Sequence, residues 1–225
     1  MRIFSLLSRY FSSKLCKSLP TGRRGFTLVE LVVVVAIIVV ITATILIRQA
    51  RFDSSTLLRS LSYSIALTVR SAQVYGISVR ANVTAQSNCS GFYSAGACYA
   101  PAYGVYFNNA TSYLLFADNN GDGSYAAGSD TIVQTYQIGA GFRISKFCAT
   151  PTTGAQQCWL NAGGGTLTWL SVYFKRPNPD ALFVSSAGGT YNNAYIQVSA
   201  INDPTNTHSI TVSPTGQIAV GVSGT

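Results

Sequence analysis

The stretch RRGFTLVELVVVVAIIVVITATILI, residues 23–47, decides how the rest of the chain is organised. From Phe26 to Ile47 it contains apolar residues, three threonines and a single acid, Glu30. A helix of this length, at a rise of about 1.5 Å per residue, spans the roughly 30 Å hydrocarbon core of a bilayer. The sequence therefore predicts one membrane-spanning helix over residues 26–47.

The segment GFTLVEL, residues 25–31, resembles the processing signal of type IV prepilins and pseudopilins. In that family a membrane peptidase cleaves after the glycine and N-methylates the new terminus. The resemblance implies cleavage between Gly25 and Phe26, methylation of Phe26, and an assembly role for Glu30. The alternative is an ordinary single-pass anchor. A secretory signal fits less well, since its apolar core is usually shorter and is followed by a small-residue cleavage site.

Glu30 also has a physical interpretation. A carboxylate in lipid costs about 3 kcal/mol on insertion scales, and such residues are functional by default. Arg23 and Arg24 would leave with the leader after cleavage. The partner we expect is then the new ammonium group of Phe26 in a neighbouring copy. The alternative is that Glu30 stays hydrated near the membrane surface.

The net charge of +8 is unevenly distributed. Residues 1–25 carry six basic side chains and no acid, which leaves +2 for the remaining 200 residues. A cleaved leader at 1–25 therefore weakens the argument that a basic protein binds nucleic acid. The positive-inside rule places this leader in the cytoplasm and the chain after Ile47 outside, as a single-pass inner-membrane protein that later joins a pilus or pseudopilus.

Helical periodicity continues beyond the membrane segment. An apolar stripe at three- and four-residue spacing predicts an amphipathic continuation over residues 48–76, with Gly76 as the helix stop. The period then changes to two, which predicts an exported β-rich domain over residues 77–225. The expected fold class is α+β and pilin-like, with one long N-terminal helix packed on antiparallel sheet. The expected strands are Ile77–Ala85, Ala102–Phe107, Tyr113–Ala117, Thr131–Ile138, Phe142–Phe147, Leu167–Phe174, Ala181–Val184, Ala194–Ser199, Ser209–Ser213 and Gln217–Val222.

The layout of long helix, immediate strand and hairpin-rich domain resembles the H-class minor pseudopilins of type II secretion and the T-class fimbrial minor pilins. The strings LRSLSYSIALTVRSAQVYG, ISVRANVT, FADNNGDGSY and VSPTGQIAV carry this looser likeness. It implies a structural subunit and not an enzyme. The implied partners are other pilin subunits, prepilin peptidase, an inner-membrane assembly platform and membrane lipid.

Four cysteines remain outside the leader, which removes Cys16. An even number in an exported domain favours disulfides. The pairing we expect joins Cys89 to Cys98 and Cys148 to Cys158, and the two other pairings stay open. A zinc site is a weaker alternative, because the spacings differ from the usual C-x₂₋₄-C pattern.

The loop DNNGDG, residues 118–123, matches the first half of an EF-hand calcium loop. Oxygens of Asp118, Asn120 and Asp122 could converge on a hard cation, with Asp130 near the position of the usual glutamate. Calcium is therefore the one cofactor that the sequence suggests. The alternative is a polar turn between two strands, where Asp, Asn and Gly are common.

Support for other chemistry is weak. Lys175 and Arg176 begin a proline-rich turn that could contact phosphate, so a pilus-associated receptor for DNA uptake is the alternative function. The only histidine is His208, and the chain has no G-x-S-x-G elbow, so a catalytic triad has little basis.

Overall fold

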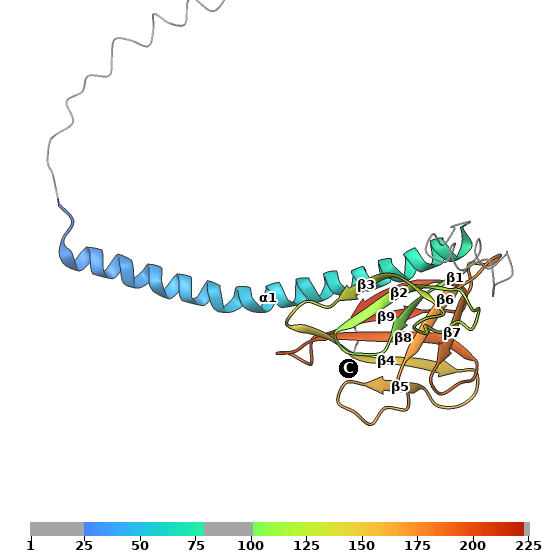
Figure 1. Cartoon of the computed structure of the whole chain (residues 1–225). Coiled ribbons are helices and arrows are strands. Elements are labelled where there is room, and N and C mark those ends of the chain that lie inside the picture. The colour runs from blue at the N-terminus through green and yellow to red at the C-terminus, as the bar shows by residue number, and fades with distance from the viewer. Residues whose placement is uncertain (1–24, 79–100, 223–225) are drawn as a thin grey trace, which may run out of the picture. The chain divides into compact units, whose positions relative to one another are not determined.

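The computed structural model describes residues 25–78 and 101–222. The chain divides into two compact units, residues 1–49 and residues 50–225. One helix, α1 (Leu28–Ile77), begins in the first unit and ends in the second. All the strands that the structure describes belong to the second unit (Figure 1).

The second unit contains two antiparallel sheets of five strands each. The first sheet has the order β3-β2-β1-β6-β7 and the second the order β10-β9-β8-β4-β5. The strands are β1 (Ala102–Phe107), β2 (Ser112–Asp118), β3 (Thr131–Gln137), β4 (Phe142–Pro151), β5 (Gln157–Leu160), β6 (Leu170–Phe174), β7 (Ala181–Ser185), β8 (Tyr191–Ala200), β9 (Thr207–Val212) and β10 (Ile218–Val222). The α+β pilin-like fold class is confirmed.

The apolar stripe of α1 packs into a core shared by both sheets. Leu58, Ile65, Val69 and Ala72 are fully buried, as the helical spacing predicts. They join one cluster with residues such as Phe107 of the first sheet and Phe147, Ile196 and Ile210 of the second. This part of the helix is therefore held by tertiary packing, because the amphipathic face has apolar surface to bury.

Gly76 does not have the role that the sequence predicts. It lies inside α1, which continues to Ile77, and its φ is not positive as a left-handed helix cap requires. A Cβ at this position would lie 2.4 Å from the backbone oxygen of Phe174. Glycine is needed here because β6 comes so close to the helix. The prediction that a strand starts at Ile77 is wrong, because Ile77 belongs to α1. Residues 79–85 of that predicted strand lie outside the described residues.

One polar residue of α1, Gln73, is buried. Gln73 lies outside the apolar stripe of the helix, yet only 3% of its surface is accessible. Its amide nitrogen donates to the carbonyl oxygens of Pro179 at 2.8 Å and Gly216 at 3.2 Å. Its side-chain oxygen accepts a hydrogen bond from Arg70. Gln73 thus ties the helix to two turns that are more than a hundred residues away in the sequence.

The strand β5 is absent from the sequence-based expectations. Its sequence, QCWL, is short and has no alternating pattern. It pairs with β4, and the ring of Trp159 stacks on Phe147 with centroids 4.8 Å apart. The contacts that define β5 are therefore tertiary. The terminal hairpin of β9 and β10, in contrast, forms where the sequence predicts it.

Candidate functional site

The first turn of α1 is built by the residues of the GFTLVEL segment. The hydroxyl of Thr27 accepts a hydrogen bond from the backbone N–H of Glu30 at 3.3 Å, so Thr27 caps the helix. Glu30 is the acid in the first turn, where the positive end of the helix dipole favours a carboxylate. Thr27 and Glu30 have the spacing of a capping box. Local geometry therefore explains why the helix begins here.

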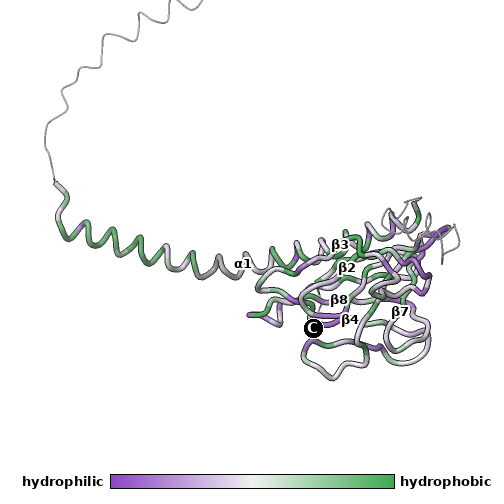
Figure 2. Tube along the Cα trace, in the orientation of Figure 1, coloured by the Kyte–Doolittle hydropathy of each residue, from purple (hydrophilic) through white to green (hydrophobic). Residues whose placement is uncertain are grey.

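The first half of α1 is apolar on every side. The helix over Leu28–Leu46 is long and apolar enough to cross a membrane, and none of it is buried by the rest of the described chain. Figure 2 shows most of this half as hydrophobic. The hydroxyls of Thr42 and Thr44 donate to carbonyls of their own helix, at 2.8 Å to Ile38 and 2.8 Å to Ile41. A helix of this kind needs lipid or other helices around it.

The comparisons with known proteins agree with this geometry. The family model for the prokaryotic N-terminal methylation motif matches residues 20–46. This match supports a type IV pilin-like protein through its N-terminal motif. Neither the curated proteins nor the solved structures contain a match to the chain. The motif implies processing by prepilin peptidase and assembly with other pilin subunits, and the apolar helix fits a single-pass membrane anchor.

The residue roles within the motif stay predictions. Gly25 and Phe26 precede α1 without regular structure, and the Phe26 side chain is 80% exposed. Glu30 is exposed as well. The structure thus leaves the predicted cleavage point and the predicted assembly residue exposed.

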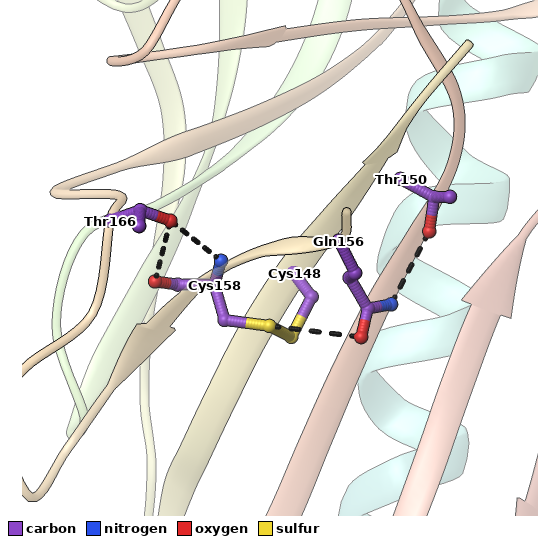
Figure 3. The surroundings of a disulfide bond; sticks show 5 residues. All are labelled: Cys148, Thr150, Gln156, Cys158 and Thr166. Atoms are coloured by element: carbon purple, nitrogen blue, oxygen red, sulfur yellow. Dashed lines mark hydrogen bonds between the residues drawn. A yellow bond between two sulfur atoms is a disulfide. The ribbon is translucent and has the colours of Figure 1, made fainter. Parts of the chain in front are cut away.

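A disulfide joins Cys148 of β4 to Cys158 of β5 (Figure 3). The two residues are direct partners in the strand register, and their Cα atoms are 4.0 Å apart. The threonine hydroxyl of Thr166 accepts the Cys158 backbone N–H at 3.1 Å, which holds the following loop against β5. The expected local pairing of Cys148 with Cys158 is confirmed. Cys89 and Cys98 lie outside the described residues.

The predicted calcium loop folds around its own backbone donors. The two carboxylate oxygens of Asp118 accept N–H groups of Gly121 at 2.7 Å and Gly123 at 2.8 Å. Those of Asp130 accept N–H groups of Asn119 at 3.0 Å and Ala126 at 2.8 Å. These hydrogen bonds stabilise the turn without a cation.

The other predicted calcium ligands, Asn120 and Asp122, hydrogen-bond to each other: the Asn120 amide donates to Asp122 at 2.8 Å. Over residues 25–78 and 101–222, no three His, Cys, Asp or Glu side chains are placed to hold a metal ion. Calcium binding by Asp118, Asn120, Asp122 and Asp130 stays a prediction.

Burial raises the pKa of Asp118 above its ordinary value, although the N–H groups of Gly123 and Gly121 act in the opposite direction. Burial likewise raises the pKa of Asp130. The negative charges of the neighbouring acids raise both values further. The loop is thus an acidic turn whose partly buried carboxylates are held by hydrogen bonds.

His208 lies on β9, and it faces a cation. Burial lowers the pKa of His208 below 6.5, and the positive charge of Arg59 lowers it further. Arg59 and His208 line the same cavity together with Tyr63 and residues of β10. Among the described residues that line this cavity there is no carboxylate of the kind that orients a catalytic histidine in a Ser-His-Asp triad.

Proposed function

We propose that this protein is a minor pseudopilin or minor pilin, a structural subunit that enters a filament through the first half of α1. The observation that carries the proposal is the apolar helix that the rest of the described chain leaves uncovered, with Glu30 in its first turn, inside the residues that match the methylation motif. Such a helix must be covered. In the membrane lipid covers it, and in a filament the helices of neighbouring subunits do.

Glu30 supplies the specificity of that assembly. Cleavage after Gly25 creates an ammonium group at Phe26, four residues before the carboxylate. In an apolar surrounding, a carboxylate without a partner costs several kcal/mol, and an ammonium from a neighbouring subunit removes most of that cost. The pair sets the register between subunits, since a shift of one turn would leave both charges in lipid.

The leader sets the orientation. Its six basic residues and no acid favour a cytoplasmic N-terminus. The β-domain then lies outside the inner membrane, where the disulfide of Cys148 and Cys158 is stable. From that position the domain contacts other minor subunits or cargo. Whether the filament serves secretion or is a pilus depends on those contacts.

Mass spectrometry of the purified protein tests the processing step. We expect an N-methylated phenylalanine from Phe26 as the first residue, and an intact Met1 would refute the proposal. For assembly, we expect Glu30→Ala to insert in the membrane at the wild-type level but to be missing from isolated filaments. Thr42→Ala, a change in the same helix that leaves all charges in place, is the matched control. Normal incorporation of Glu30→Ala would remove the role of Glu30.

The DNA-receptor alternative has no comparable observation in its favour. Lys175 and Arg176 line two cavities, and an acid lines each of them, Asp118 in one and Asp180 in the other. A phosphate backbone binds best to a surface of one charge. Salt-sensitive DNA binding by the full chain would nevertheless favour this alternative.

A further inference from the structure

A trough runs between the outer face of α1 and the edge strand β10. It consists of two adjoining cavities of about 480 and 260 Å³, and Tyr63 and Val220 line both. The residues that define this α1–β10 trough are Arg59, Tyr63, Leu67, Arg70, Ile218 and Val220. All of them lie within the second unit of the chain.

The floor of the trough is apolar and open. Leu67 is 66% exposed and Tyr63 46%, although both belong to the half of α1 that packs on the domain. Ile218 and Val220 are half-buried and turn their side chains toward the core side of the sheet, which α1 also covers. The trough thus exposes apolar side chains from two elements to one shared space.

One wall of the trough is the edge strand β10. β10 is the last strand of the second sheet, and it pairs only with β9 among the strands that the structure describes. The N–H of Ser213 donates to the carbonyl of Gln217 at 3.0 Å, which identifies a hydrogen-bonded pair. Such pairs alternate along an antiparallel ladder, so the backbone N–H and C=O groups of Ile218 and Val220 point away from β9. They are available to another strand.

The two ends of the trough are positively charged. Arg59 lies at the end near Val222, and Arg70 at the end near Gly216. Arg59 contacts the face of the Tyr63 ring, and Arg70 donates to Gln73. Neither forms an ion pair with an acid in the described part of the chain, and no acid lines either cavity. The complementary charge is a carboxylate.

We propose that the α1–β10 trough binds an extended segment of a partner protein, which adds to β10 as a further strand. The backbone of the segment pairs with the outward N–H and C=O groups of β10. Alternate side chains of the segment are apolar and cover Leu67 and Tyr63. An Asp or Glu at one end of the segment meets Arg59 or Arg70. This site does not depend on assembly through the first half of α1.

The dimensions fit a short strand. Arg59 and Arg70 are eleven residues apart in α1, which corresponds to about 16 Å along the helix axis. The five residues of β10 cover about 17 Å at roughly 3.4 Å per residue. A partner segment of about five or six residues therefore reaches from one arginine to the other. A carboxylate at either end of it has a cation within reach.

The test uses the full chain in detergent and a set of fluorescent peptides. Each nine-residue peptide alternates valine and threonine, with one glutamate moved through every position, and a matched set carries lysine instead. Fluorescence anisotropy gives the affinities. We expect at least one glutamate peptide to bind about fivefold more tightly than its lysine counterpart, the size expected for a partly exposed ion pair. N-methylation of alternate amides in that peptide should abolish binding.

Variants locate the site. Arg59→Glu or Arg70→Glu should reverse the preference from glutamate to lysine at the matching end. Leu67→Asp should weaken binding about tenfold, whereas Leu160→Asp on β5, at the opposite edge of the same sheet, should leave it unchanged. Equal binding of the N-methylated peptide, an unchanged charge preference in both arginine variants, or no binding by any peptide below about 1 mM would overturn the proposal. The proposal would also be overturned if the chain formed a dimer and the peptides did not dissociate it.

Discussion

Replacing Gly76 by alanine should destabilise the β-domain, although glycine-to-alanine changes in helices usually stabilise. The helix propensity gained is about 0.5–1 kcal/mol. Against it, the new methyl group would lie 2.4 Å from the oxygen, 2.8 Å from the carbonyl carbon and 2.9 Å from the Cβ of Phe174. Two of these atoms are backbone, so the end of β6 or the last turn of α1 must move. Overpacking of this kind costs about 1–3 kcal/mol.

We expect a net loss of about 1–2 kcal/mol, or a fall in Tm of about 2–8 °C for a domain of this size. Thermal melting of the full chain in detergent, followed by circular dichroism, measures it. Ser60→Ala on the exposed face of α1 is the control, and it should be neutral or slightly stabilising.

The variant Gly76→Asn distinguishes two reasons why Gly76→Ala could lose stability. Either residue 76 is a left-handed helix cap, or its side chain clashes with β6. A left-handed cap tolerates asparagine better than alanine, whereas a close approach tolerates it less, because asparagine is larger. A Gly76→Ala protein as stable as Ser60→Ala, or a Gly76→Asn protein more stable than Gly76→Ala, would refute the steric argument.

Three further predictions concern the β-domain. Replacing both Cys148 and Cys158 by alanine should lower the free energy of unfolding by about 2–3 kcal/mol, the loop entropy of so short a bridge; a chemical denaturation midpoint equal to the wild type would contradict this. Because burial lowers the pKa of His208 in the folded state, the unfolded chain binds its proton first, so stability should fall as the pH drops below about 6.5. His208→Gln should flatten that part of the profile, and a profile identical to the wild type would exclude His208 as its cause. A chelator should leave the Tm unchanged, because backbone N–H groups already hold Asp118 and Asp130; a lower Tm in chelator would restore the calcium interpretation.

Features that depend on neighbours in the sequence could be predicted well. The apolar span to Ile47 and the buried stripe from Leu58 to Ala72 follow from composition and helical spacing. The strands β1–β4 and β6–β10 follow from period-two alternation and from turn residues. In each case the deciding interactions act over a few residues, so the local pattern contains most of the information.

Features that depend on distant contacts could not be predicted. Gln73 looks like a surface residue until the carbonyls of Pro179 and Gly216 appear beside it. Gly76 looks like a helix stop until β6 approaches it. β5 has no strand pattern of its own, and its pairing with β4 places Cys158 opposite Cys148. The sequence left three cysteine pairings open, and only this register selects among them.

The sequence by itself therefore predicted a processing signal, an apolar helix long enough to cross a membrane, and a β-rich domain after it. The first two of these reside in one contiguous segment, Gly25–Ile47, whose chemistry is the same in any fold. Only the tertiary structure brought Arg59 and Arg70 of α1 beside the edge strand β10, some 150 residues later in the chain. A binding surface built from two distant elements exists only after the chain has folded, because no local pattern specifies which faces will meet.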